Sequence, residues 1–374
     1  MPMEILGQQF LQLDFVTALQ VVALGFVGGV LSGFIGSGGA FFMTPGMMNM
    51  GVIGPVAVGS NIAHKFGKAI IGSKKHGELG HVDRKLAAFM LITAAIGIRI
   101  AVVIMKALFK DHGSGHGGES SAGADLYISV VFVSVLSVVS VSMLRDILRS
   151  RKGEDSQPSR KIVDFLNRFR LPPMIHFPVA DVNVSLWVVL LGGLGTGYLA
   201  GTIGVGGFVG VPAMIYVFGV PAAVAAGSEL YLAIFTGAFG LLNYGFEGMI
   251  DLRLTLLLYL GSLMGIYIGA YGTKVVKEIV IRLATSVIIL LCVVSRMFAI
   301  PVYLRNLGTL SYDASLDVWL NGASKGMLYV SGLSTTVLIL VFVFRGYFQR
   351  RRVQASIVSS GPPLMGSQLA RKES

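Results

Sequence analysis

The chain contains little charge, one cysteine and no basic residue before Lys65. Asp, Glu, Lys and Arg make up 13% of its 374 residues, about half the share found in a typical soluble domain. The single Cys292 cannot form an internal disulfide or a cysteine-based metal cluster, so both are excluded. Because no Lys or Arg precedes Lys65, the start of the chain lacks the basic region of a secretory signal peptide.

Apolar residues, by contrast, make up 54% of the chain, and its mean hydropathy is +0.75. Several apolar runs reach the length of about 18 residues that is needed to cross about 30 Å of hydrocarbon. The sequence therefore predicts an all-α fold, a polytopic bundle of transmembrane helices. We expect long helices at about 15–35, 55–72, 86–109, 125–148, 183–201, 222–245, 252–273, 278–300 and 326–347, and short apolar segments at about 40–52 and 204–218.

The net charge of +11 is concentrated in a few connections. Eight of the 30 Lys and Arg residues lie between Arg145 and Arg170, and six lie from Arg345 onwards. Basic residues gather in this way in the cytoplasmic loops of membrane proteins. The charge therefore predicts a multi-pass protein of a bacterial inner membrane, with no nucleic-acid partner. One further short connection contains Lys74, Lys75, Arg84 and Lys85.

An internal repeat relates the two halves of the chain at an offset of 168 residues. The windows 25–97 and 193–265 each contain 16 glycines, and 12 of these coincide. Composition alone would give roughly three or four coincidences, so the two halves share one structural unit. We expect the glycines at four-residue spacing to let helix backbones pack closely. The matched positions include Gly25, Gly29 and Gly33 with Gly193, Gly197 and Gly201, and Gly59-Ser60 with Gly227-Ser228.

Charge also predicts how the halves are oriented in the bilayer. The loop 73–85 carries four Lys or Arg residues, whereas the equivalent loop 246–253 carries only Arg253. The positive-inside rule places the first loop in the cytoplasm and the second outside. The halves would then be inverted repeats, which is the architecture of many secondary transporters.

The chain divides accordingly into two repeats and several additions. The additions are a connector, an external loop, a final helix and a tail whose composition is typical of disorder. The expected divisions are 1–148 for the first transmembrane repeat, 149–182 for the basic cytoplasmic connector, 183–300 for the second transmembrane repeat, 301–325 for the external loop, 326–348 for the final transmembrane helix and 349–374 for the disordered basic cytoplasmic tail.

Two glycine clusters, 36–39 and 204–207, stand at equivalent positions, each between a packing helix and a short apolar segment. Glycines that break a helix free the backbone, and the next half-helix begins with unpaired N–H groups and a positive dipole end. Such ends bind anions at the midplane of inverted-repeat carriers. The alternative interpretation is a tight re-entrant turn that needs glycine for its geometry alone.

Asn61, His64, Lys65 and Lys68 lie at i, i+3, i+4 and i+7, on one face of a predicted helix. A lysine deep in a bilayer is costly, and it usually faces a cavity or a partner. The equivalent position to Asn61 in the second half is Glu229, the one acidic residue deep in an apolar segment.

Two interpretations of this polar face remain open. In the first, Lys65 pairs with Glu229 and Lys68 reaches the cytoplasmic surface. In the second, the polar face and the glycine clusters together form an anion site, where Glu229 neutralises the empty site or carries a proton. The candidate substrate-binding residues are Gly36, Ser37, Gly38, Gly39, Asn61, His64, Lys65, Gly204, Gly206, Gly207, Ser228 and Glu229.

With these motifs the chain resembles the sulfite exporter TauE/SafE family of bacterial membrane carriers. The resemblance is carried by the duplicated Gly-x-Gly-Gly breaks, the downstream Pro45 and Pro212, the Gly-Ser after each, and the Gly-x-x-Gly-x-x-Asp turns at 77–83 and 245–251. It covers most of residues 15–300. It implies a transporter that moves sulfite, sulfonates or related organic anions, mainly outwards, and that is not an enzyme.

We therefore expect a secondary transporter that exports a small anion, with protons as a candidate coupling ion and the lipid bilayer around it. The chain has no ATP-binding loop of the form G-x-x-x-x-G-K-[ST], and an inside-negative potential favours the export of a negative charge. No cofactor and no metal site are expected. Two alternatives remain: an intramembrane enzyme that uses His64 and Glu229 as acid and base, and a non-transporting partner or sensor whose connector and tail dock cytoplasmic proteins.

Overall fold

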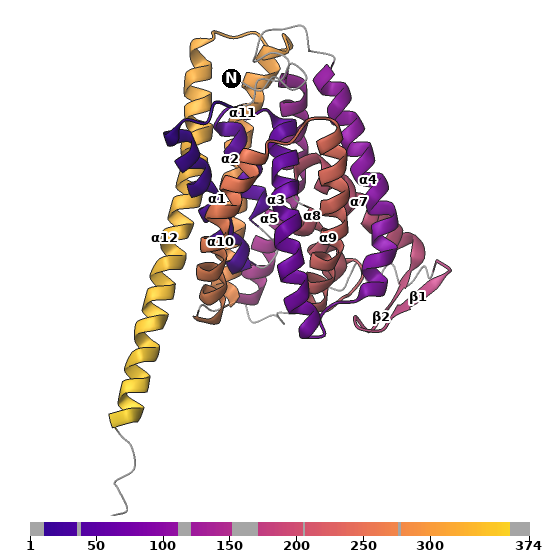
Figure 1. Ribbon diagram of the computed structural model, residues 1–374, viewed down its shortest axis with the longest axis vertical. Helices are drawn as coiled ribbons and strands as arrows, with labels where there is room; N and C mark the ends of the chain where they lie inside the picture. Colours follow the sequence, from indigo (N-terminus) through magenta and orange to yellow (C-terminus); the bar gives the residue numbers. More distant parts are fainter. Residues whose placement is uncertain are drawn as a thin grey trace, which may run out of the picture.

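The computed structural model describes residues 11–35, 39–110, 121–151, 171–204, 206–275 and 278–359. Long helices lie side by side in a bundle, with a small β-hairpin at one end (Figure 1). The elements are α1 (Phe15–Ile35), α2 (Ala40–Asn49), α3 (Gly54–Glu78), α4 (Arg84–Lys110), α5 (Ala122–Arg151), β1 (Met174–Phe177), β2 (Val182–Ser185), α7 (Leu186–Ile203), α8 (Gly206–Tyr216), α9 (Ala222–Phe246), α10 (Leu252–Val275), α11 (Glu278–Asn306) and α12 (Ser315–Ser359).

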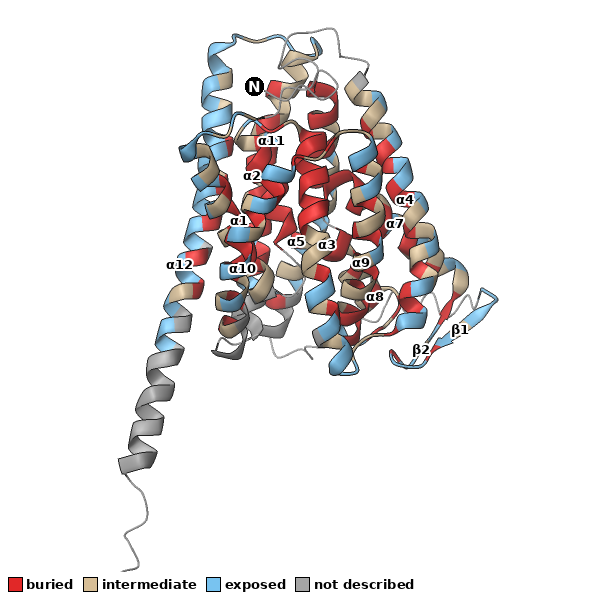
Figure 2. Cartoon of the chain, viewed as in Figure 1, coloured by how far each residue is buried: buried red, intermediate tan, exposed pale blue. Residues whose placement is uncertain are grey.

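The bundle presents apolar side chains on its outside. Among the described residues, eight helices are long and apolar enough to cross a membrane, judged by length and composition. Many large hydrophobic side chains along them are exposed, for example Val138, Leu256 and Tyr267, while the buried residues line the interior (Figure 2). The helix α3 has 25 residues, enough for about 37 Å at 1.5 Å per residue, but polar side chains interrupt it. The chain is a multi-pass, all-α membrane protein.

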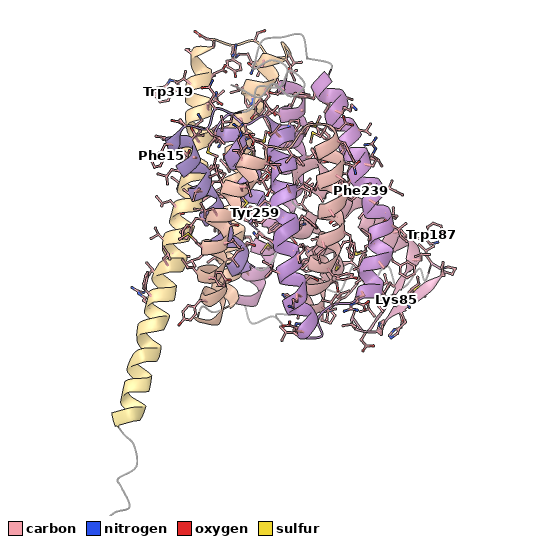
Figure 3. The ribbon with its side chains drawn as sticks, in the orientation of Figure 1. Phe15, Lys85, Trp187, Phe239, Tyr259 and Trp319 are labelled. Carbon is pink, nitrogen blue, oxygen red and sulfur yellow. The ribbon has the colours of Figure 1, made fainter. Side chains whose placement is uncertain are left out.

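The two tryptophans lie at opposite ends of the bundle. Trp187 lies beside the hairpin, whereas Trp319 lies near the start of α12 at the other end (Figure 3). The two residues are 57% and 78% exposed. Tryptophan is enriched at both membrane–water interfaces, because its ring has an apolar body and one polar N–H. The positions of Trp187 and Trp319 are those expected of interfacial side chains.

The two short apolar segments are half-length helices. With 10 residues in α2 and 11 in α8, each is about 15–17 Å long, roughly half of the hydrocarbon thickness. Each contains a proline, Pro45 or Pro212. Neither helix is long enough to cross a bilayer alone, and whether the segments predicted at 40–52 and 204–218 are re-entrant stays a prediction.

The glycine repeats pack helices from different halves against each other. The helix α1 packs along α10, and their repeat equivalents α7 and α4 pack in the same way. A Cβ atom at Gly29 would lie 2.6 Å from the Cα atom of Ser262, and one at Gly197 would lie 2.5 Å from the Cα atom of Ala94. Real Cβ atoms do not approach a backbone so closely, so the predicted packing role of these glycines is confirmed.

The central helices α3 and α9 run antiparallel. Near the start of α3, Ser60 Oγ accepts a hydrogen bond of 3.0 Å from the backbone N–H of Asp251, which follows α9. Near the start of α9, Ser228 Oγ accepts one of 2.9 Å from the backbone N–H of Asp83, which follows α3. Each helix therefore begins where the other ends. This packing agrees with inverted repeats, and the orientation of the halves in a membrane stays a prediction.

The β-hairpin was not expected in the segment predicted as a cytoplasmic connector. The strands β1 and β2 pair antiparallel, with Phe177 opposite Val182. A side chain from another element holds the turn: Asp83 Oδ2 accepts hydrogen bonds of 3.1 Å from the N–H groups of Val179 and Ala180. Strands of four residues show too few alternations to be recognised from sequence, and this support comes from far away in the chain.

The final helix is longer than the sequence suggested. It begins at Ser315, before the expected start near residue 326, and continues to Ser359. The expected external loop is correspondingly short, because α11 continues to Asn306. Asp313 Oδ1 accepts a hydrogen bond of 2.9 Å from the Ser315 backbone N–H at the start of α12. This bond holds the pKa of the Asp313 carboxyl below its usual value.

Candidate functional site

The second glycine break separates α7 from α8. Gly204 ends α7 with a φ of +74°, a left-handed conformation that favours glycine. A Cβ atom at Gly204 would lie 2.9 Å from Asn61 Nδ2 and 3.2 Å from Thr44 Oγ1, both in the first half. Glycine is therefore needed at position 204 by the backbone conformation and by the close approach of the other repeat.

An ion pair lies beside the first turns of α8. Lys65 Nζ on α3 is 3.7 Å from Glu229 Oε1 on α9, and the two side chains are 17% and 5% exposed. Two glycines of α8 leave room for the pair. A Cβ atom at Gly206 would lie 3.4 Å from Lys65 Nζ, and one at Gly210 would collide with Glu229 Oε2. The predicted pairing of Lys65 with Glu229 is confirmed.

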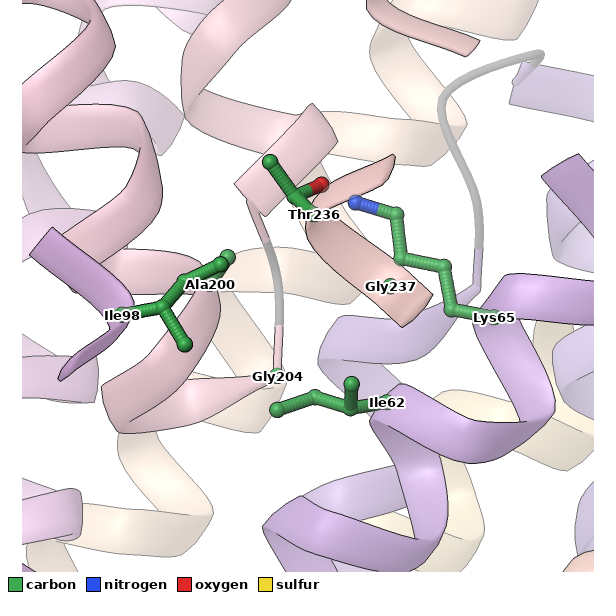
Figure 4. A pocket seen from close by; sticks show the side chains of 7 residues that line it. All are labelled: Ile62, Lys65, Ile98, Ala200, Gly204, Thr236 and Gly237. Carbon is green, nitrogen blue, oxygen red and sulfur yellow. The ribbon is translucent and has the colours of Figure 1, made fainter. Parts of the chain in front are cut away.

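A small pocket opens next to Lys65. Figure 4 shows the Lys65 ammonium and the Thr236 hydroxyl on facing sides of it. Its volume suits about one water molecule, less than an oxyanion needs. It lies where α3, α4, α7 and α9 meet, at the end of α7. Its lining residues are Ile62, Lys65, Ile98, Ala200, Gly204, Thr236 and Gly237.

Asn61 joins the two breaks. Its Nδ2 donates hydrogen bonds of 2.9 Å to Ala40 O and 2.8 Å to Thr44 Oγ1, both in the first turns of α2. Thr44 Oγ1 in turn donates to Ile203 O at the end of α7, over 3.2 Å. Side chains of the first half thus bind the last turn of α7 to the start of α2. The start of α2 and the end of α7 therefore lie close together.

Three buried polar atoms around this junction have no hydrogen-bond partner among the described residues. They are Asn61 Oδ1, Thr196 Oγ1 and Glu229 Oε2. These three residues lie in the interior of the bundle and are 0–5% exposed. An unpaired buried polar group costs about 1–3 kcal/mol, and such groups are uncommon in folded proteins. These three atoms lie near the ion pair and the helix break, where a bound ligand or a proton can pair with them.

The remaining candidates divide into four groups. Gly39 and Gly207 are buried at the starts of α2 and α8. His64 instead faces α10, with its Nε2 atom 2.7 Å from Ser262 Oγ and its ring 4.8 Å from the Tyr259 ring. Ser228 lies near the end of the bundle, where its Oγ accepts the hydrogen bond from the Asp83 backbone N–H. Three candidates lie outside the described residues, namely Gly36, Ser37 and Gly38.

Sequence reasoning missed Thr44, Thr196 and Gly210. Each is a small residue in an apolar helix, with no charge and no unusual spacing. The approach of Thr44 to Asn61 and of Gly210 to Glu229 depends on how four separate helices cross, and Thr196 lies beside Gly210. The glycine breaks were the only signal that pointed towards them.

Other charged residues within the helices lie elsewhere. Arg99 is exposed and donates to Asn243 Oδ1 over 3.1 Å. Lys106 Nζ lies 2.5 Å from Glu247 Oε2, at the end of α9. Arg296 is fully buried and bonds Asn49 and Ser324, at the far end of α2. Among the described residues, no group of three or more His, Cys, Asp or Glu side chains is placed to hold a metal ion.

Comparison with known proteins places the chain in a family. The model of the family described as sulfite exporter TauE/SafE matches residues 21–296. A relative in Bacillus subtilis (strain 168), "Probable membrane transporter protein YjnA", is 26% identical over 256 residues, which cover 68% of this chain and 89% of the relative. No solved structure matches the chain. The matched region includes the ion pair and the breaks, so the expected resemblance is confirmed. The chain is a membrane transporter, not an enzyme, and belongs to the sulfite exporter TauE/SafE family.

Proposed function

We propose that this transporter exports a small anion, such as sulfite, a sulfonate or a related organic anion, across the bacterial inner membrane. The observation that carries the proposal is the position of Lys65, a cation within a membrane bundle, next to the first turn of α8. The family description names sulfite export. The basic connections 73–85 and 145–170 support the cytoplasmic orientation described from the sequence.

The chemistry of the site suits an anion. The first N–H groups of α8 have no partner within the helix, and the helix dipole adds a positive partial charge there. Lys65 supplies a full positive charge beside Gly206. The buried hydroxyl of Thr196, which has no described partner, can donate a further hydrogen bond. Ammonium, hydroxyl and backbone N–H groups are the donors that an oxyanion accepts.

The present pocket is too small for sulfite, so transport requires α3, α8 and α9 to separate locally. The half-length of α2 and α8 makes this local separation feasible, because such a helix has one end inside the protein. Gly204 and Gly206 on either side of the break allow the backbone to change direction. We propose that the anion occupies the enlarged pocket between Lys65 and the start of α8.

Purified protein in proteoliposomes tests the function. Labelled sulfite should leave the vesicles with saturable kinetics in the presence of the protein, and Lys65→Ala should reduce the rate at least tenfold. Lys106→Ala is the matched control, because it removes the same charge beside Glu247, which is about 27 Å along α9 from Glu229. Equal sulfite flux in protein-free vesicles and in vesicles with inserted protein would contradict the proposal.

A further inference from the structure

The Lys65–Glu229 pair has a consequence for the ions that accompany the anion. In the described structure Glu229 Oε1 faces Lys65, while Glu229 Oε2 is buried without a partner. An anion that binds Lys65 must take the place of this carboxylate. Because both negative groups need the same ammonium, they compete for it.

Lys65 is the cation that pairs with Glu229. Among the described residues, Lys65 is the only cation within 4 Å of the Glu229 carboxylate. A Cβ atom at Gly210 on α8 would collide with Glu229 Oε2 and would lie 3.1 Å from Thr196 Cγ2 on α7, so two uncharged residues lie on this side of the carboxylate. Lys68 lies one turn beyond Lys65 on α3, and His64 on the same helix bonds Ser262 instead.

The helix α4 supplies no alternative partner. Its Ile98 lines the pocket. Its Arg99 bonds Asn243, which is about 21 Å along α9 from Glu229. An ionised Glu229 displaced from Lys65 would therefore be a buried charge without a partner, and such a charge is strongly destabilising.

We infer that the anion binds Lys65 only when Glu229 holds a proton, so that one proton travels with each anion in the same direction. This inference rests on the proposed function. In the empty transporter, the ammonium of Lys65 and the carboxylate of Glu229 balance each other. In the loaded transporter, the ammonium and the bound anion balance each other, and the proton on Glu229 keeps that group neutral. Both states have the same net charge, so a singly charged anion moves without net charge transfer.

The cycle also gives a role to the empty state. When the anion leaves on one side, Glu229 releases its proton and pairs again with Lys65. The paired, neutral site can then return across the midplane. The direction of net transport follows the sum of the anion and proton gradients, and the membrane potential has no effect on a monovalent anion. Net export therefore requires an outward anion gradient that exceeds any inward proton gradient.

The test uses the full-length protein in vesicles with labelled methanesulfonate and labelled sulfite in parallel. Methanesulfonate keeps one negative charge over the assay range, so its proton stoichiometry can be read directly with a pH-sensitive dye. For wild type we expect one proton per anion, acceleration by a pH gradient, and no response to a potassium diffusion potential.

The Glu229→Gln variant separates coupling from binding. Glutamine cannot release a proton, and it leaves Lys65 unpaired when the site is empty. Anion-for-anion exchange should therefore persist within about threefold of wild type, while net flux falls at least tenfold and loses its dependence on the pH gradient. Glu247→Gln, which makes the same change at the pair with Lys106, should behave as wild type.

The possible results are distinguishable. Wild-type flux that follows the electrical potential and carries no proton would overturn the coupling and leave the proposed transport function intact. The same would follow if Glu229→Gln kept the pH response of its net flux. Absence of both exchange and net flux for both anions, with inserted protein, would overturn the transport function and the coupling together. Loss of exchange in a folded Glu229→Gln protein would mean that Glu229 is needed for binding, which contradicts the competition.

Discussion

Asn61 and Glu229 occupy equivalent positions 168 residues apart in the two repeats, but they make different contacts at the same junction. The amide of Asn61 donates to Ala40 O and Thr44 Oγ1 and fixes the start of α2. The carboxylate of Glu229 pairs with Lys65 across the interface of α3 and α9. One half thus supplies a fixed, neutral group and the other a titratable group, so the duplicated scaffold carries an asymmetric site.

Substitution of Gly206 by valine should stop transport. A Cβ atom at this position would lie 2.6 Å from Ala200 Cβ and 3.4 Å from Lys65 Nζ, so a branched side chain would fill the approach to Lys65. We expect at least a tenfold loss of labelled sulfite flux with normal membrane insertion. Gly195→Val is the control, because no atom lies within 4 Å of a Cβ there. Full flux in the Gly206→Val protein would remove the start of α8 from the proposed site.

The glycines that join α1 to α10 should be needed for stability. At Gly29 a Cβ atom would lie 2.6 Å from the Cα atom of Ser262, and backbone cannot move aside cheaply. Gly29→Leu should therefore lower the thermal unfolding temperature in detergent by several degrees or prevent folding, since overpacking costs about 1–3 kcal/mol or more. Gly326→Ala, at an open helical position, should be neutral or slightly stabilising. An unchanged unfolding temperature in Gly29→Leu would show that the helices separate readily.

The two serines that bind the ends of α3 and α9 should each contribute a similar amount to the free energy of unfolding. Ser60→Ala leaves the N–H of Asp251 without its acceptor, and Ser228→Ala does the same to Asp83. Each change should lower the free energy of unfolding by about 1–3 kcal/mol, because a buried donor loses its partner. The sites lie at opposite ends of the bundle, so the double variant should show the sum. A clearly non-additive double variant would indicate that the two ends are coupled through the central helices.

Asp83 should hold the β-hairpin. Its carboxylate accepts hydrogen bonds from Val179 and Ala180 and one from Leu86 at the start of α4. Asp83→Ala should increase hydrogen exchange across residues 174–185, while Asp181→Asn, at a turn position with φ of +50°, should not. If the hairpin amides exchange equally slowly in both variants, the strand pairing alone is sufficient to hold the hairpin without Asp83.

Much of the fold was predictable from the sequence because membrane helices can be recognised by their length and apolar content. The prediction of helices over 55–72 and 222–245 agrees closely with α3 and α9, and the half-length of α2 and α8 follows from their short apolar runs. The pairing of Lys65 with Glu229 was also predictable, because a charged residue within a bilayer needs a partner.

The rest depended on tertiary contacts. That His64 faces Tyr259 on α10 rather than the α8 break follows from the rotation of α3 about its axis, which one sequence pattern does not specify. The close approach of Gly210 to Glu229 arises where α8 meets α9. The hairpin is supported by Asp83, about 95 residues earlier in the chain, and no local pattern reports such support.

Initial rates of labelled sulfite export from proteoliposomes show whether Lys65 binds the transported anion. Wild type and the Lys106→Ala control should show saturable export. Lys65→Ala should lose at least nine-tenths of the rate, and Lys65→Arg should recover part of it because the positive charge is restored. Export by Lys65→Ala at the wild-type rate, with the same saturation, would show that Lys65 does not bind the transported anion.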